Sequence, residues 1–145
     1  MTIPQWVLLG FAAWTLMTLM ATVGIYRWSR ILAGRARISQ WRADEQQGSG
    51  WYARAMRAHA NCVENLPVYG AVVLCATAAQ VNDGLLDVLA AILLGARILQ
   101  TVTHLSFRQT DAIASLRFTF FVVQVLCMLA MGLHVAMSAA REAAV

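Results

Sequence analysis

The side chains best suited to chemistry lie on one stripe of a predicted helix that is otherwise largely apolar. The stripe carries Arg54, Arg57, Asn61 and Glu64, and at about 100° per residue these positions fall within roughly 80° of arc. Charge at membrane depth is costly and is retained mainly where it faces a protein interior and serves a purpose. We therefore take this stripe as the first candidate for a binding or catalytic site.

A second polar face follows on the next predicted helix, which carries Arg97, Gln100, Thr101, His104 and Arg108. Their spacings place all of them within roughly 100° of arc. If these two antiparallel helices are level at their cytoplasmic ends, Arg97 lies at the same depth as Glu64. An unpaired charge there would be costly, so the sequence predicts an ion pair between Glu64 and Arg97, either architectural or in contact with a ligand.

Arginines from the other helices complete this polar cluster. Arg117 lies about 9 Å into the fourth predicted helix, and Arg27 and Arg30 lie at the end of the first. With Arg57 they predict a funnel of guanidinium groups that faces the cytoplasm, with amide and imidazole groups deeper inside. Planar guanidinium groups bind carboxylates bidentately, so the expected ligand is a small polyanion with amide-like groups.

The composition indicates a membrane protein. Of the 145 residues, 60% are hydrophobic and 12% are charged, and the mean hydropathy is +0.62. Soluble domains average about 25% charged residues. The net charge is +4, but the arginines lie mostly at helix ends or inside helices, so we do not expect nucleic-acid binding. No metal-ligand spacing is present, and we expect no metal.

Four apolar segments predict an all-α fold, an integral membrane four-helix bundle within one domain over residues 1–145. The predicted helices cover about residues 4–26, 52–81, 85–107 and 112–140, and each exceeds the roughly 20 residues needed to cross a bilayer. The first apolar run is too long for a signal-peptide core, so we expect a retained helix. The long polar stretch at about residues 27–51 is the predicted first loop.

The distribution of arginine predicts the orientation of the bundle. The first loop and the third connection carry arginine, whereas the second connection, around Asn82 and Asp83, carries none. By the positive-inside rule, loops one and three face the cytoplasm and both termini lie outside. Arg35, Arg37 and Arg42 in the first loop are interpreted as positive-inside and headgroup contacts.

A gap-free motif, R-x-x-R-A-H-x-N-x-x-E-x-x-P, spans the start of the second predicted helix. It is read at Arg54, Arg57, Ala58, His59, Asn61, Glu64 and Pro67. With this motif, and with Arg97 in a G-x-R context, nearly the whole chain resembles the MAPEG family, the membrane-associated proteins in eicosanoid and glutathione metabolism. The chain resembles the bacterial branch, which suggests the bacterial inner membrane. The family implies a homotrimer that holds glutathione in a cytoplasm-facing cleft between subunits, with a lipophilic small-molecule substrate that enters from the lipid bilayer.

The resemblance also implies roles for individual residues. Those expected to bind glutathione are Arg27, with Arg30 as an alternative, Arg54, Arg57, Asn61, Glu64, Gln100 and His104. Arg117 is the candidate for the family's activating arginine, whose guanidinium would stabilise the glutathione thiolate. An alternative alignment of the family's Arg-Ser pair on Ser115 places Ala114 at that position, and glutathione would then bind without activation.

These residues favour a membrane glutathione transferase or peroxidase, in which thiolate glutathione attacks a lipophilic electrophile or hydroperoxide. The alternative is a non-catalytic glutathione-binding or structural membrane protein of the same fold. A small anion transporter or channel subunit is less favoured, because the charged stripes fade toward the outer side of the bundle.

Overall fold

The computed structural model describes residues 1–41, 50–142 and 144. Its first helical segment is continuous from Ile3 to Leu32. This segment consists of α1 (Ile3–Thr18), a π-helical stretch η1 (Leu19–Gly24) and α2 (Ile25–Leu32). π-helical turns such as η1 are usually short insertions in an α-helix. The Thr22 hydroxyl of η1 donates a hydrogen bond to the carbonyl of Thr18, the last residue of α1.

The rest of the described chain is also helical. A short 3-10 turn, η2 (Ile38–Gln40), precedes the three long helices α3 (Gly50–Ala78), α4 (Gly84–Ser106) and α5 (Asp111–Glu142). Over the described ranges there is no strand, and the all-α prediction is confirmed.

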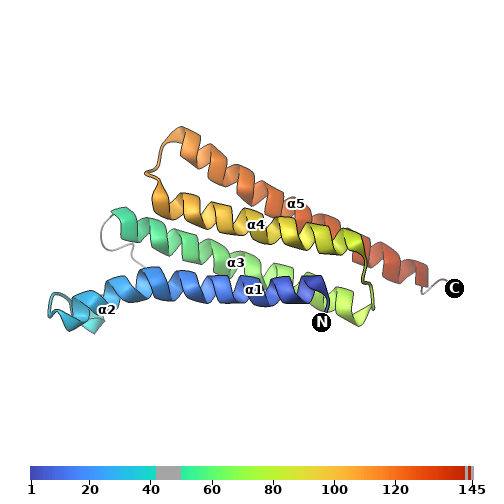
Figure 1. Ribbon diagram of the computed structural model, residues 1–145, viewed down its shortest axis with the longest axis horizontal. Helices are drawn as coiled ribbons and strands as arrows, with labels where there is room; N and C mark the ends of the chain where they lie inside the picture. The colour runs from blue at the N-terminus through green and yellow to red at the C-terminus, as the bar shows by residue number, and fades with distance from the viewer. Residues whose placement is uncertain (42–49, 143, 145) are drawn as a thin grey trace.

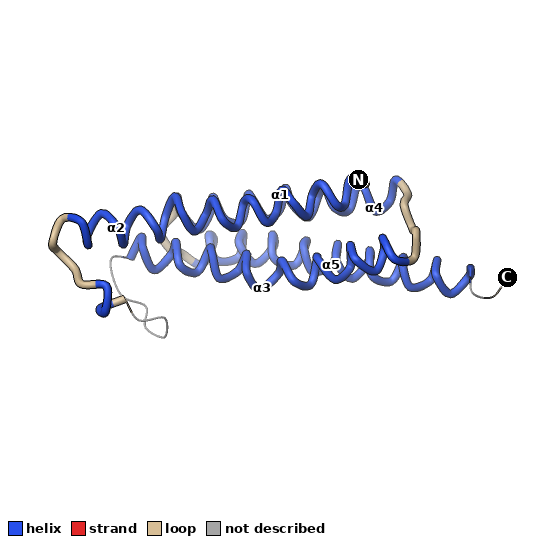
Figure 2. The backbone as a smooth tube through the Cα atoms, turned by 90° about the horizontal axis from the view of Figure 1, so that it is seen from below, coloured by secondary structure: helices blue, strands red, loops and turns tan. Residues whose placement is uncertain are grey.

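The long helices form an elongated bundle in which sequence neighbours run antiparallel (Figure 1). The N-terminus and the turn between α3 and α4 lie at one end of this bundle (Figure 2). We call the other end, which holds α2, the start of α3 and the α4–α5 connection, the basic end. Arg27, Arg30, Arg54, Arg57 and Arg117 all lie on the helical turns near it.

The first helix is longer than the sequence predicted. It ends at Leu32 rather than near residue 26, so Arg27 and Arg30 are helical and the first loop begins later than predicted. The polarity of this last part suggested a loop, but arginine, leucine and isoleucine are all compatible with a helix that leaves the membrane. Residues 42–49 of the predicted loop, with Arg42, lie outside the described residues.

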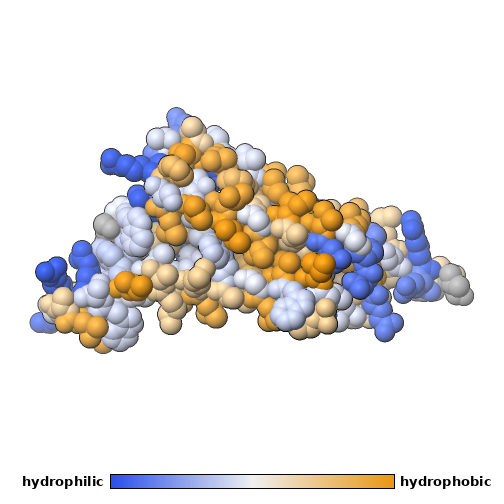
Figure 3. Space-filling view, viewed as in Figure 1, coloured by the Kyte–Doolittle hydropathy of each residue, from blue (hydrophilic) through white to orange (hydrophobic). Residues whose placement is uncertain are grey.

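Three helical segments are long and apolar enough to cross a membrane, namely Ile3–Leu32, Gly84–Ser106 and Asp111–Glu142. α3 has 29 residues, about 44 Å of helix, but the arginines and amides of its first half make it less apolar than the others. Hydrophobic residues dominate the middle of the face in Figure 3, and hydrophilic residues gather toward its ends. The prediction of four apolar spans therefore holds by composition for three of the segments.

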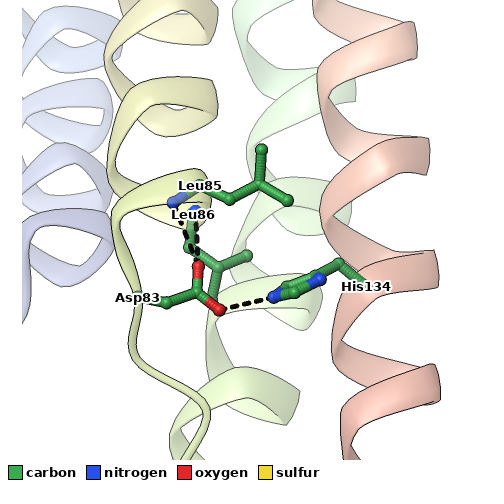
Figure 4. A network of polar contacts seen from close by, with 4 residues as sticks. All are labelled: Asp83, Leu85, Leu86 and His134. Carbon is green, nitrogen blue, oxygen red and sulfur yellow. Dashed lines mark hydrogen bonds and ion pairs between the residues drawn. The ribbon is translucent and has the colours of Figure 1, made fainter.

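A core of buried apolar side chains joins the helices, and it includes Phe11, Tyr69, Leu93 and Met131. The Tyr69 hydroxyl donates to the Pro4 carbonyl at 3.0 Å, so this buried polar group is satisfied. Asp83 is the N-cap of α4, and its Oδ1 accepts hydrogen bonds from the backbone nitrogens of Leu85 and Leu86, each at 3.1 Å (Figure 4). This cap satisfies donors that the first turn of a helix leaves unpaired.

Candidate functional site

His104 lies at the centre of a polar cluster that three helices form at the basic end. Its Nδ1 atom is 3.0 Å from Arg117 Nη1 on α5, and its Nε2 atom is 3.3 Å from Asn61 Nδ2 on α3. Arg54 on α3 donates from Nε to the His104 carbonyl at 3.2 Å. His104 and Arg117 are 7% and 8% exposed, so these contacts are well shielded. The structure therefore brings four of the predicted site residues together.

The local fold explains why His104 meets Arg117. α4 ends at Ser106 and α5 begins at Asp111, and so short a connection makes the two helices antiparallel neighbours. His104 lies on the last turn of α4 and Arg117 on the second turn of α5, which places their side chains at a similar depth. The face of α4 that carries His104 also carries Gln100 and Arg97, each buried.

Gln100 extends the cluster deeper into the bundle. Its Nε2 donates to the Arg117 carbonyl at 3.1 Å, and its Oε1 accepts from Arg97 Nη1 at 2.9 Å and from Gln124 Nε2 at 3.1 Å. Gln124 Oε1 in turn is 3.5 Å from Asn65 Nδ2 on α3. One chain of hydrogen bonds therefore runs from the basic end to the middle of the bundle and links α3, α4 and α5.

The predicted ion pair between Glu64 and Arg97 is wrong for the single chain. Arg97 is fully buried, its guanidinium lies 5.5 Å from the centre of the Phe11 ring, and its Nε and Nη2 have no hydrogen-bond partner. Glu64 is exposed. The buried face of α3 passes through Cys62 and Asn65, and Glu64 lies about 100° from Asn65 around the helix, on a neighbouring face from which it forms no ion pair with Arg97.

Arg27 and Arg30 do not join the His104 cluster within one chain. Arg27 Nε donates to the Tyr52 hydroxyl at 2.5 Å, and its guanidinium also lies 5.4 Å from the Trp41 ring. Arg30 lies 4.8 Å from the Tyr26 ring. Tyr52 is roughly 180° around α3 from Asn61, so these two arginines lie on the opposite side of α3. The predicted funnel is therefore split in two parts.

Arg57 lies at the mouth of the His104 cluster. It is exposed, and its Nη1 is 3.4 Å from Gln109 Oε1 in the α4–α5 connection. Together with Arg54, which holds the His104 carbonyl, and Arg117, which contacts the ring, it places three guanidinium groups near His104. Positive charge with amide donors, partly shielded from solvent, suits a carboxylate or another anion.

Two buried amides in the cluster were not among the predicted site residues. Gln124 is fully buried and Asn65 is 8% exposed. Gln124 follows Arg117 by seven residues, which places both on the same side of α5. A lone amide in the apolar run of α5 therefore indicates a buried polar contact next to Arg117. Asn65 directly follows Glu64 but lies about 100° around α3 from it, outside the predicted polar stripe.

An apolar groove runs between α3 and α5. One part, of about 540 Å³, is lined by Asn65, Val68, Met128 and Leu129 among others, and a second part, of about 490 Å³, is lined mostly by alanine and glycine. Val72 and Gly132 line both parts, so the groove is continuous. Small residues of this kind allow another helix to approach closely. Among the residues that the structure describes, no cluster of His, Cys, Asp or Glu could hold a metal ion.

The fold and the cluster together define a helical membrane protein with a buried, basic polar site at one end of its bundle. The chain belongs to the MAPEG family, whose model matches residues 6–137, nearly the whole chain. This confirms the resemblance that the motif on α3 indicated. A search of curated proteins found no match, and neither did a search of solved structures.

Proposed function

We propose that the protein is a glutathione transferase or peroxidase that uses the His104 cluster to bind glutathione and to stabilise its thiolate. The observation that carries this proposal is the shielded guanidinium of Arg117, held 3.0 Å from His104 and next to Asn61. A fixed cation beside a thiol favours its ionised form, and the thiolate is the reactive nucleophile. Arg54 and Arg57 supply further charge for the carboxylates of the tripeptide.

The chemistry asks little else of the protein. As a transferase, the thiolate sulfur bonds to an electrophilic carbon of the acceptor, and the leaving group departs with its electron pair. As a peroxidase, the sulfur attacks a hydroperoxide oxygen, the O–O bond breaks, and an alcohol and glutathione sulfenic acid form; a second glutathione then yields the disulfide and water. Both routes depend on thiolate stabilisation and on positioning.

The same proposal includes a homotrimer with the site completed between subunits. The two parts of the predicted funnel lie on opposite sides of α3, so Arg27 and Arg30 reach the His104 cluster only from a second copy. The groove between α3 and α5 fits such a helix, and α1 presents large exposed side chains, such as Leu9, Leu16 and Met17. A neighbour's α1 in this groove would carry its Arg27 toward Asn61.

We place this trimer in a bacterial inner membrane, with the termini outside and the basic end in the cytoplasm, where glutathione is available. The arginines at the basic end support this orientation. The lipophilic acceptor would reach the site from the lipid bilayer, since the middle of the bundle is apolar.

An ultraviolet difference titration of glutathione into the detergent-solubilised protein tests the proposal. We expect the titration to show a saturable thiolate absorbance in the wild type. In a separate assay of turnover, Arg117→Ala should lose about 100-fold, a typical cost for removing one donor that stabilises charge. Arg117→Lys keeps a cation and should retain part of the signal. Absence of saturable binding in the wild type would reject the proposal.

A non-catalytic glutathione-binding protein is the second candidate. It is favoured by Ala114, which stands one turn before Arg117 at the alternative activating position and has no group to stabilise a thiolate. Calorimetry on the same sample separates the candidates, because a binder would show saturable heat without thiolate absorbance, and Arg117→Ala would leave its affinity largely intact.

A further inference from the structure

The contact between Arg117 and His104 fixes where the proton of the imidazole lies. A guanidinium has five N–H donors and no acceptor. Because Arg117 Nη1 lies 3.0 Å from His104 Nδ1, Nδ1 must be the acceptor and can carry no proton. In the neutral ring the proton is then on Nε2, which faces Asn61 at 3.3 Å.

This proton also decides which way the Asn61 amide faces. A protonated Nε2 needs an acceptor, so the atom of Asn61 beside it is Oδ1, which a 180° turn of the amide group exchanges with Nδ2. The two orientations of an amide occupy the same space, and the hydrogen-bond partners decide between them. Hydrogen bonds then run in one direction, from Arg117 to His104 and from His104 to Asn61. The two hydrogens of Asn61 Nδ2 point away from His104.

We propose that His104 is a positioning residue of the glutathione site, which holds the Arg117 guanidinium and turns the Asn61 amide donors toward the bound anion. This inference rests on the proposed function of the same site. It requires a neutral imidazole, because an imidazolium would set an N–H against Arg117 Nη1. The Arg117 guanidinium already lies 3.0 Å from the ring, so a further cation there is unfavourable.

Backbone contacts support a fixed position for this ring. Arg54 holds the His104 carbonyl at 3.2 Å, and Gln100 Nε2 holds the Arg117 carbonyl at 3.1 Å. His104 and Arg117 are both more than nine-tenths buried. The imidazole thus lies between two anchored backbones, and its acceptor nitrogen is the contact that orients the guanidinium.

Two substitutions separate positioning from packing. His104→Gln offers an amide oxygen to Arg117 and an amide N–H to Asn61, and so retains both contacts. His104→Leu fills similar space but can make neither. His134→Gln and His134→Leu are the matched controls, since His134 lies on α5 at the other end of the bundle.

The readouts are the thiolate absorbance of bound glutathione as a function of pH and the nitrogen NMR signals of isotope-labelled histidine in the full-length protein. We expect His104→Leu to lower the thiolate fraction at neutral pH by about tenfold, while His104→Gln and both controls stay within about threefold. The His104 ring should show a bare Nδ1 and a protonated Nε2.

Three results would overturn the inference: a protonated Nδ1, an unchanged thiolate fraction in His104→Leu, or equal losses in His104→Gln and His104→Leu. All three leave the wild-type thiolate signal and its sensitivity to Arg117→Ala intact, so the proposed function survives them. If the wild type binds no glutathione, the proposed function fails and the positioning role fails with it.

Discussion

Asp83 and His134 join the turn before α4 to the C-terminal half of α5. His134 Nε2 lies 2.5 Å from Asp83 Oδ2, while Oδ1 of the same carboxylate caps the first turn of α4. Figure 4 shows both contacts on the one side chain. Asp83 thus caps the first turn of α4 through one carboxylate oxygen and links α4 to α5 through the other.

Substitutions at Asp83 should separate the cap from the pair. Asp83→Ala removes both, and we expect the free energy of unfolding to fall by about 1–2 kcal/mol, mostly from the lost cap. Asp83→Asn keeps a good cap and should lose less than about 1 kcal/mol, the usual value of a surface ion pair. Thermal unfolding in detergent measures both, and equal losses in the two variants would show that the cap contributes little.

Acid should weaken the same contact. The hydrogen bond from His134, followed by those from the backbone of Leu86 and Leu85, lowers the pKa of Asp83 below its usual 3.8. A carboxylate whose pKa is lower in the folded state stabilises the fold above its unfolded pKa, and this stability is lost as the pH falls through the folded pKa. The stability gap between wild type and Asp83→Asn should therefore shrink between about pH 5 and pH 2; a gap that widens in acid would contradict this sign.

Glu64→Gln tests the separation of Glu64 from Arg97. Because Glu64 is exposed and makes no ion pair with Arg97 in the chain, we expect the unfolding free energy of the detergent-solubilised monomer to change by less than about 0.5 kcal/mol. Breaking a buried ion pair would cost about 3–5 kcal/mol. Arg97→Ala is the contrast, and it should cost more than about 2 kcal/mol because a fully buried side chain is removed.

The amide chain in the middle of the bundle predicts a cost for Gln124→Leu. Gln100 Oε1 would lose one of its two donors and Asn65 Nδ2 would lose its acceptor. Buried polar groups left without a partner cost about 1–3 kcal/mol each. Leu126→Val, on an exposed position of the same helix, is the control, and a Gln124→Leu variant as stable as this control would argue that the amides do not depend on one another.

Much of the fold was predictable from the sequence because apolar length and arginine placement are strong signals in a membrane protein. The helix order followed from the apolar segments, and the polar faces of α3 and α4 followed from a period of 3.6 residues. The similar depth of Asn61, His104 and Arg117 followed from the rise of about 1.5 Å per residue. The extension of the first helix to Leu32 was not predictable. The polarity of Arg27 and Arg30 indicates exposure to water, and it does not distinguish an exposed helix from a loop.

Rotation about the helix axis was the harder problem. Glu64 and Asn65 differ by about 100° in direction, and the motif alone gave no reason to prefer Asn65 as the residue that faces the bundle. The depth argument that paired Glu64 with Arg97 considered only position along the helix axis, whereas an ion pair also depends on rotation around that axis. Gln124 illustrates the same limit, because its partners lie on α3 and α4, and only packing decides which face of α5 meets them.

Arg54 gives the last prediction, because it stabilises the end of α4 from another helix. The last four carbonyls of a helix lack partners within it, and His104 is among these residues since α4 ends at Ser106. Arg54 Nε donates to that carbonyl at 3.2 Å, and a cation there also interacts favourably with the helix dipole. Arg54→Ala should therefore loosen the last turn of α4.

Hydrogen exchange measures this effect directly. We expect amides in the last turn of α4 to exchange about two- to fivefold faster in Arg54→Ala, as a contribution of about 0.3–1 kcal/mol implies, while the first turn of α4 at Leu85 and Leu86 is unchanged. Arg30→Ala is the matched control, because Arg30 is exposed and contacts Tyr26 rather than α4. Equal exchange in the two variants would mean that the contact from Arg54 does not hold the helix end, and the position of the His104 ring would then depend on Arg117 and Asn61 alone.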